Sequence, residues 1–329
     1  MQKIHTHKKY FLGLVALLSA FTACGSNKSG DYVVDETYVH KYGVAVPPTF
    51  WKESGKNGAV VSTMANGVVV SRSYQEGVLD GDTSYSFPHS SQIEKIETYR
   101  QGDLVKTTNY YFEGTAKSEK EPSDKEGLYT LSSWYLSGTP RSKETYNAEL
   151  LVSGQYFDIN NHKDASVEDS QGTRLIRDDY GHLLATDTID QGQIALKTTY
   201  HPNGAPKEQI PYRNGVIEGS KKTFYPAGEP ATIEPWTKGK QHGITLTFQH
   251  GEKLSDVPYV NGVKEGKEIR YRDGKTVVQE INWKNGLQHG ATTTYVGNTS
   301  KVEWFYQGKS TTKSDYDFLS NRPPVKTAT

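Results

Sequence analysis

Several groups of residues in this 329-residue chain have types that could support chemistry. The segment QGKS at 307–310 has the glycine, lysine and serine of a phosphate-binding loop. A Walker A motif also needs a glycine five residues before Gly308, where Glu303 stands. Adjacent acids at 168–169 and 178–179 have no histidine or nucleophile at a recognisable spacing. These patterns predict no catalytic residues, no nucleotide or other cofactor, and no small-molecule substrate.

The single cysteine, Cys24, lies in a context that indicates a covalent modification. Three lysines precede an apolar run from Tyr10 to Phe21, which is shorter than the ~20 residues needed to span a bilayer and is typical of a secretory signal. The run ends in FTAC, which resembles the bacterial lipoprotein signal, in which the cysteine becomes the lipidated first residue. We therefore expect a signal peptide at 1–23, lipid on Cys24 that anchors the chain in a membrane, and a polar tether at 24–40. The alternative is an ordinary signal peptide followed by an incidental cysteine.

Composition and charge narrow the classes of partner. A mean hydropathy of -0.71, with 31 glycines and 22 tyrosines, describes a polar chain rather than a large packed α/β enzyme. Removal of residues 1–23 removes three lysines and no acid, so the mature chain has 35 basic and 38 acidic residues. This net charge of -3 gives no support for nucleic-acid binding or for attraction to anionic lipid. A single thiol also excludes an internal disulfide.

A repeat with a period of 22 to 24 residues runs through the chain. Its clearest copies are YRNGVIEG (212–219), WTKGKQHG (236–243), YVNGVKEG (259–266) and WKNGLQHG (283–290), and YQEGVLDG (74–81) is an upstream copy. A second pattern, an aromatic followed by Gly-x-Pro, occurs at 135–140, 200–206 and 225–230. We expect a repeat array over 41–310 that is degenerate in 115–195 without forming a separate domain, and a flexible tail at 311–329.

Each repeat has the features of a β-hairpin. Asn-Gly between alternating polar and apolar segments favours a type I′ turn, and Gly-x-Pro supplies the return turn. We expect the second glycine, four residues later, to lie in a strand where an aromatic of the neighbouring repeat packs on bare backbone. The fold predicted is all-β: an elongated antiparallel meander of stacked hairpins. The turn and packing glycines are Gly77, Gly81, Gly215, Gly219, Gly239, Gly243, Gly262, Gly266, Gly286 and Gly290.

One aromatic residue opens each copy of the repeat, and together they form a predicted strip on the sheet. Its members are Tyr212, Trp236, Tyr259, Trp283 and Tyr306. The strip is interpreted first as a hydrophobic spine, and alternatively as an exposed surface for a partner.

The histidines of the repeat were candidates for a metal site. His242 and His289 precede the second glycine in alternate repeats, so four strands at about 4.8 Å separate them by roughly 19 Å. This distance excludes a shared metal ion. Because Glu218 and Glu265 occupy the same position, we expect a solvated position and no metal.

The motif YxNGxxxG at this period resembles MORN-type repeats, in particular the bacterial variant known as the YwqK antitoxin-like family. The resemblance implies an elongated sheet of stacked hairpins used for protein or membrane contacts. The expected function is a non-catalytic interaction scaffold in the cell envelope, lipid-anchored at the outer membrane and bound to an unidentified protein. The alternatives are a soluble antitoxin-like, toxin-neutralising protein and an envelope glycan hydrolase.

Overall fold

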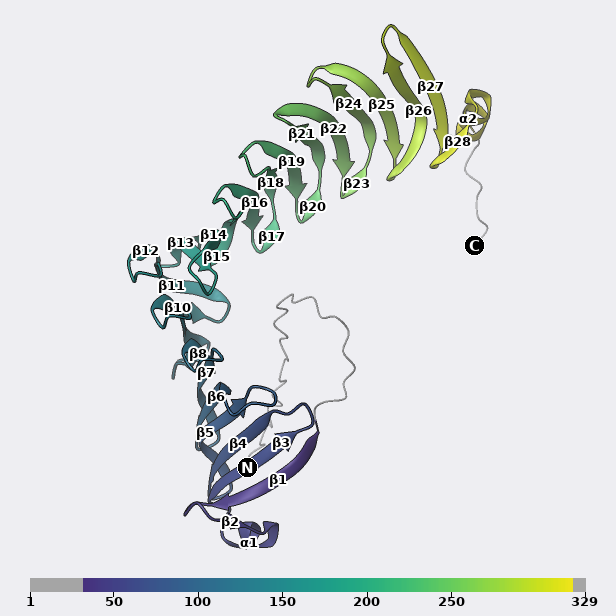
Figure 1. Cartoon of the computed structure of the whole chain (residues 1–329). Helices are drawn as coiled ribbons and strands as arrows, with labels where there is room; N and C mark the ends of the chain where they lie inside the picture. The colour runs from purple at the N-terminus through teal and green to yellow at the C-terminus, as the bar shows by residue number, and fades with distance from the viewer. Residues whose placement is uncertain (1–31, 322–329) are drawn as a thin grey trace, which may run out of the picture.

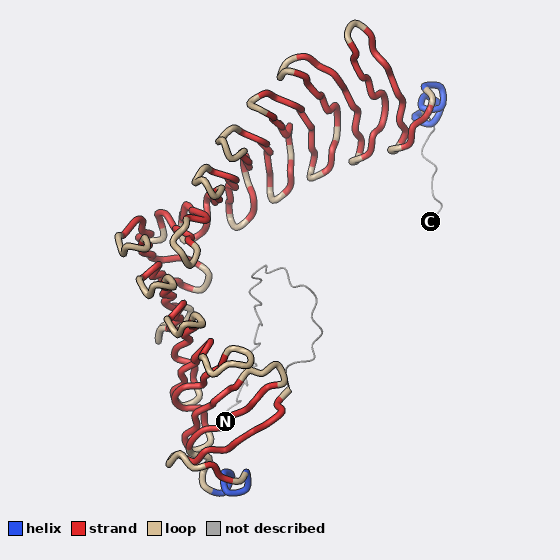
Figure 2. The backbone as a smooth tube through the Cα atoms, in the orientation of Figure 1, coloured by secondary structure: helices blue, strands red, loops and turns tan. Residues whose placement is uncertain are grey.

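The described part of the chain is one open antiparallel sheet of hairpins. The computed structural model describes residues 32–321, in which 28 strands form a single meander that bends along its length (Figure 1). Strands and tight turns alternate almost without interruption, and helices occur only near the two ends of this range (Figure 2). The predicted fold class is confirmed.

The element bounds show the repeat directly. The first group comprises β1 (Val33–His40), β2 (Ala45–Val46), α1 (Pro48–Glu53), β3 (Gly58–Met64), β4 (Val69–Gln75), β5 (Val78–Ser86), β6 (Ile93–Arg100), β7 (Asp103–Tyr110), β8 (Ala116–Pro122) and β9 (Leu128–Trp134). The middle group comprises β10 (Pro140–Asn147), β11 (Leu150–Phe157), β12 (Lys163–Glu168), β13 (Gln171–Arg177), β14 (Leu183–Asp190), β15 (Gln193–Tyr200) and β16 (Pro206–Arg213). The last group comprises β17 (Val216–Ile217), β18 (Gly219–Phe224), β19 (Pro230–Thr237), β20 (Lys240–Gln241), β21 (Gly243–Gln249), β22 (Glu252–Val260), β23 (Val263–Lys264), β24 (Gly266–Arg272), β25 (Thr276–Lys284), β26 (Leu287–Val296), β27 (Thr299–Tyr306), β28 (Lys309–Thr311) and α2 (Lys313–Ser320).

The first glycine of each repeat closes a hairpin and also joins it to the preceding one. Asn261 and Gly262 have φ of 51° and 88°, and a type I′ turn requires positive φ at both of its central residues. The Gly262 N–H donates to the carbonyl of Gln241, one repeat earlier, at 2.8 Å. The same inter-repeat bond is made by Gly77, Gly102, Gly192, Gly239, Gly286 and Gly308. Each turn is therefore held by its predecessor.

The second glycine lies at a bulge, which the sequence did not predict. In the antiparallel register Gly219, Gly243 and Gly266 pair with Trp236, Tyr259 and Trp283 of the next repeat. A Cβ on Gly243 would nevertheless meet no aromatic ring within 4 Å; it would lie 2.8 Å from Cγ of Pro235, and φ there is +119°. The expected packing of an aromatic on bare backbone is thus wrong in detail, because the residue before the repeat's own aromatic fills that space.

Proline suits this bulge because the strand needs no amide donor there. Pro211, Pro235 and Pro258 each precede the aromatic of a repeat, and their carbonyls accept from the N–H that precedes the second glycine, at 2.9–3.1 Å. A proline in a strand is tolerated at bulges and edges, where no ladder hydrogen bond is lost. The proline, the aromatic residue that follows it and the bulge at the second glycine therefore form one recurring structural unit.

The return turns carry a second ladder of side chains between repeats. Tyr135 is fully buried, and its hydroxyl donates to the carbonyl of Phe157 at 2.7 Å. The same donation, to a carbonyl 23 residues along the chain, recurs at 2.9–3.0 Å in the pairs Tyr111–Trp134, His201–Phe224 and Tyr225–Phe248. These bonds fix the distance between successive return turns and account for the constant period of the sequence.

The segment 115–195 continues the array, as predicted. Strands β8 to β15 pair in sequence order within the same sheet. The one cluster of fully buried apolar side chains lies here among the described residues: Leu151, Tyr156, Val167 and Ile189. Elsewhere the thin sheet leaves most side chains half-buried, so this segment is the best-packed part of the described chain.

Both predicted ends of the array need correction. The tether was expected to reach residue 40, but Val33–His40 forms β1, which pairs along its length with β3. The tail was expected to be flexible from residue 311, but Lys313–Ser320 forms α2, whose N-cap Thr312 accepts from the Asp315 N–H. β1 is held by its pairing with β3, whereas α2 is held in part by local contacts, the Thr312 cap and the ion pair of Lys313 with Asp317. The signal segment, Cys24 and residues 24–31 and 322–329 lie outside the described residues.

Candidate functional site

The predicted aromatic strip is largely occupied by contacts within the sheet. All five rings are half-buried. Trp236 donates its indole N–H to Glu234 at 3.1 Å, and Trp283 donates to Glu268 at 2.9 Å. Tyr306 packs beside His289 under α2, with ring centroids 5.1 Å apart. These contacts favour the structural interpretation for Trp236, Trp283 and Tyr306, whereas Tyr212 lies in a groove described below.

Carboxylates accept hydrogen bonds from these rings and from other aromatic residues of the sheet, and sequence reasoning missed them. The motif Glu-x-Tyr or Glu-x-Trp occurs at 36–38, 97–99, 144–146 and 234–236, and in each of these copies the ring's O–H or N–H donates to the acid two residues earlier. Residues i and i+2 of a strand share one face, so the spacing alone could have predicted the bond. Glu268 is 2% exposed and also binds Lys264 and Arg270.

The polar residue before the second glycine is exposed or partly exposed, as predicted, and it is also a hydrogen-bond acceptor, which was not predicted. Glu218 and Glu265 each accept from a backbone N–H at the next hairpin turn, at 2.6 Å. His242 and His289 accept from the equivalent N–H through Nδ1, at 3.4 Å. The recurrence of Glu and His, rather than Lys, at this position was the available signal.

The acceptor role of His289 predicts a pH-dependent stability. Burial, with Lys284 nearby, lowers the pKa of His289, because both disfavour the imidazolium. The unfolded state then binds the proton more tightly, so this contribution to stability is complete above about pH 6.5 and is lost as the pH falls through the folded-state pKa. We expect the urea concentration at the unfolding midpoint of the C-terminal repeats to decrease when the pH is lowered from 7.5 to 5.

The alternate repeats supply the control for this prediction. In His289→Glu the carboxylate should accept a hydrogen bond from the Gln307 N–H, just as Glu265 accepts one from the Asn285 N–H. This carboxylate stays ionised over the same pH range. The variant should therefore lose the pH dependence that the wild type shows. An equal pH dependence in both proteins would contradict the role given to His289.

A groove opens where one hairpin of the array overlaps its neighbours. Gly154 of β11 pairs with Val167 of β12, so this pair is a common starting point for comparing the two hairpins. The β12–β13 hairpin extends two residues beyond it, to Asp169, whereas the β10–β11 hairpin extends five residues beyond it, to Glu149. The longer hairpin folds over, and the Leu151 N–H donates to the carbonyl of Gly192 at 3.0 Å. The space beside it measures about 410 Å³.

The groove combines an apolar wall with charged and phenolic groups. Its apolar lining includes Leu150, Leu151, Ile189 and Ile194, and Tyr212 also lines it. Tyr146 also lines it, but its hydroxyl is engaged with Glu144 and its ring is stacked on Tyr129. Arg174 and Lys197 supply positive charge, and Glu149 lies exposed at the tip of the longer hairpin. Of the predicted strip, only Tyr212 lies at this groove.

The two buried carboxylates near the groove, Glu144 and Asp187, differ in their hydrogen bonding. Glu144 accepts from Arg174, Tyr146 and Tyr156, at 2.8–2.9 Å. Asp187 is fully buried between Arg174 and Lys197 in the register, yet neither of its carboxylate oxygens has a hydrogen-bond partner among the described residues. Its nearest cation is Arg174, at 3.8 Å. Burial raises the pKa of Asp187 despite the opposing charges of Lys197 and Arg174.

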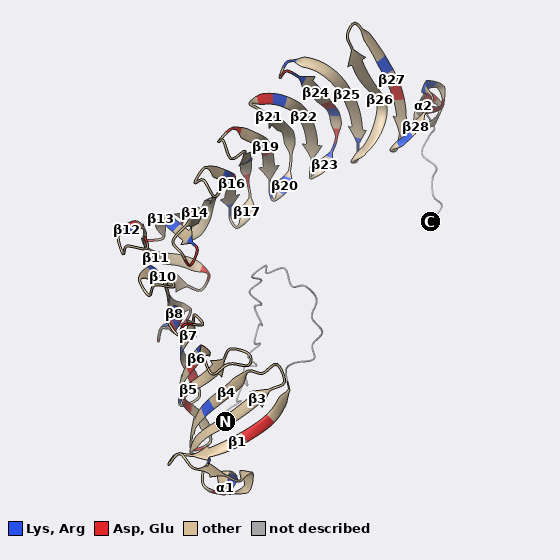
Figure 3. Ribbon diagram, in the orientation of Figure 1, with Lys and Arg blue, Asp and Glu red and all other residues tan. Residues whose placement is uncertain are grey.

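The hairpin turns of the C-terminal repeats form a second surface, which we call the hairpin rim. Val216, Val263 and Leu287, each 46–48% exposed, follow the first glycine of their repeats. Exposed cations recur beside them (Figure 3), and none of these cations forms an ion pair within residues 32–321. They are Arg213, Lys238, Lys240, Lys284 and Lys309. The net charge of the whole chain gave no indication of this local excess of positive charge.

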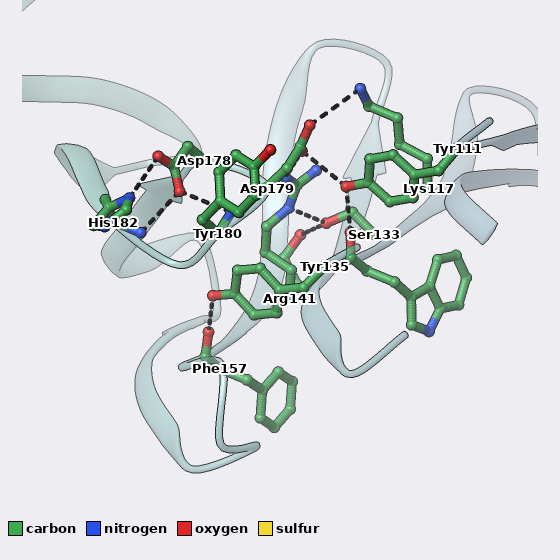
Figure 4. A network of polar contacts seen from close by, with 12 residues as sticks. Tyr111, Lys117, Ser133, Tyr135, Arg141, Phe157, Asp178, Asp179, Tyr180 and His182 are labelled. Atoms are coloured by element: carbon green, nitrogen blue, oxygen red, sulfur yellow. Dashed lines mark hydrogen bonds and ion pairs between the residues drawn. The ribbon is translucent and has the colours of Figure 1, made fainter. Parts of the chain in front are cut away.

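The acid pair at 178–179 is structural. Asp179 accepts from the Tyr111 hydroxyl at 2.8 Å and from Arg141 at 3.1 Å, and Lys117 lies 3.5 Å away (Figure 4). Although burial opposes its charge, these three groups hold the pKa of Asp179 below its usual value. Asp178 accepts from the His182 backbone and ring, which closes its own turn. We call the contacts of Asp179 the Asp179 clamp, since they join three return-turn regions.

The remaining chemical candidates are also placed by the fold. Gly308 and Lys309 belong to the turn and strand that follow β27, in keeping with a repeat and not a phosphate loop. Within residues 32–321 no group of three His, Cys, Asp or Glu side chains could hold a metal ion. No helix in the same range has the length and apolarity needed to cross a bilayer. No family model matches the chain, and no curated protein matches it.

Proposed function

We propose that this chain is a lipid-anchored envelope protein whose repeat sheet acts as a non-catalytic scaffold for a protein partner. The observation that supports it is the hairpin rim, where unpaired cations lie at four of five successive turns and exposed aliphatic side chains lie at three of them. Stacked repeats build extended surfaces of this kind, and such surfaces commonly serve recognition.

The chemistry of the rim favours an acidic partner surface. Successive turns are two strands apart, or about 10 Å, so the cations are spaced by one or two such intervals along the rim. Charge complementarity mainly governs association rate and specificity, while the aliphatic side chains bury area on contact. The anchor rests on Cys24 and the apolar run before it.

The anchor is tested by Cys24→Ala. We expect this variant to leave the membrane fraction and to incorporate no labelled palmitate, whereas the wild type does both. Unchanged processing and fractionation of the variant would refute the lipid anchor but would not test the proposed role of the hairpin rim.

The rim is tested by photo-cross-linking in native membranes. A photoreactive residue at position 263 should capture a protein, and Lys238→Glu combined with Lys284→Glu should abolish the capture. The matched control, Lys143→Glu combined with Lys207→Glu, reverses two exposed lysines away from the rim. Equal capture by both double variants, or capture of lipid alone, would contradict a protein partner at the rim.

A further inference from the structure

The groove beside β10–β11 differs from every other part of the array in how it is built. It exists because the β10–β11 hairpin extends past β12–β13 and folds over the next turns. Gly192 admits this overlap, since a Cβ there would lie 3.0 Å from Cβ of Leu150 and 3.2 Å from the carbonyl of Leu151. The groove is thus fixed by backbone contacts and does not depend on a flexible side chain.

Two polar groups at the groove remain without partners. The Lys197 ammonium forms no ion pair or hydrogen bond with the described residues, and neither does the Tyr212 hydroxyl. Both lie on adjacent strands, because Lys197 pairs with Ile210 of β16, two residues before Tyr212. An ammonium and a phenol together are donors suited to a carboxylate or a similar anion.

The charges around these donors favour an anion over a cation. Arg174 is balanced by Glu144, with a contact of 2.8 Å. Asp187 pairs with Lys197 in the register but forms no hydrogen bond with it. Glu149 is exposed to solvent at the hairpin tip. Lys197 is therefore the least compensated charge at the groove.

The remaining lining of the groove supplies apolar area. Leu150 is 40% exposed, and Leu151, Ile189 and Ile194 continue the same surface inward. The volume of about 410 Å³ lies within the range of small-ligand sites. Apolar walls with a few convergent polar groups are the usual composition of such sites.

We infer that this groove binds a small amphiphilic carboxylate, with the carboxylate on Lys197 and Tyr212 and the aliphatic body against Leu150, Leu151 and Ile194. The site adjoins the first turn of the hairpin rim at Gly215 but shares none of the rim's cations, and it does not depend on the proposed scaffold function. The buried Asp187 sets the charge beneath Lys197 and is not a contact of the ligand.

Calorimetry with sodium octanoate and 1-octanol separates the charged from the apolar part of the interaction. The full chain carrying Cys24→Ala is used, because it keeps every described residue and offers no acyl chain of its own. We expect octanoate to bind at least ten-fold more tightly than octanol. Equal affinity for the two probes, or no binding of octanoate, would overturn the inference.

Three variants assign the contacts. Lys197→Met should weaken octanoate about ten-fold and leave octanol unchanged, while Lys197→Arg should keep the preference for octanoate. Leu150→Ala should weaken both probes by a similar factor, because it removes only apolar wall. Lys240→Met, on the hairpin rim, is the control and should change neither affinity. Unchanged octanoate affinity in Lys197→Met would refute the role of the ammonium. So would a loss of affinity in Lys197→Arg as large as that in Lys197→Met, if circular dichroism shows that both variants are folded.

Discussion

Replacement of Tyr135 by Ala is expected to lower the free energy of unfolding of the middle repeats by about 3–5 kcal/mol, the cost typical of deleting a buried aromatic. Tyr135 is fully buried at its return turn, and its hydroxyl joins that turn to the carbonyl of Phe157. The variant loses the ring's packing and leaves a carbonyl without its donor. Urea unfolding followed by circular dichroism, with hydrogen exchange to locate the loss, measures the effect.

Tyr225 is the matched control, since it holds the same place in the ladder. Its hydroxyl donates to Phe248 at 3.0 Å, but 37% of the residue is exposed. Tyr225→Ala should therefore cost about 1 kcal/mol, close to the net value of one hydrogen bond. If the two substitutions were equally damaging, burial would not be the reason for the importance of Tyr135.

Gly172→Ala is the second substitution with a large expected effect, about 3 kcal/mol or more, because it combines backbone strain with a steric clash. Gly172 has φ of +140°, and a Cβ there would lie 2.2 Å from the carbonyl oxygen of Ser166. That oxygen belongs to the backbone of the paired strand β12, so relief requires movement of the sheet. We expect a lower urea midpoint and faster hydrogen exchange across β11 to β14.

Gly262→Ala separates the two contributions. Gly262 also has positive φ, +88°, but open space surrounds the position of its Cβ. Its replacement should cost only the backbone term, about 1 kcal/mol. A loss at Gly262 as large as that at Gly172 would show that conformation alone, and not contact with Ser166, determines the effect.

The hairpins were predictable from the sequence because their determinants are local. The pair Asn261–Gly262 specifies its turn through the φ values of two adjacent residues, and the spacing of such pairs gives the period. Gly172 was not singled out, because its neighbours carry no repeat motif and its need for glycine arises from Ser166 in another strand.

The groove could not be predicted, because it depends on the relative length of two hairpins. Nothing local in the sequence shows that the tip at Glu149 reaches past the tip at Asp169 and folds over Gly192. Lys197 and Leu150 meet at the groove only as a result of that overlap. By contrast, the Glu-x-aromatic motif was visible in the sequence, and its meaning follows from the side-chain alternation of a strand.

The Asp179 clamp has a mechanical consequence. Hairpins bonded mainly to their nearest neighbours peel away one at a time when tension acts between the two ends of a sheet. The clamp joins Asp179 to Tyr111 and Arg141, which are 68 and 38 residues earlier in the chain. Peeling that begins at β28 therefore meets, at this turn, several bonds that must break together. Under load the C-terminal repeats should yield first, and the clamp should act as a stop that preserves the repeats before it.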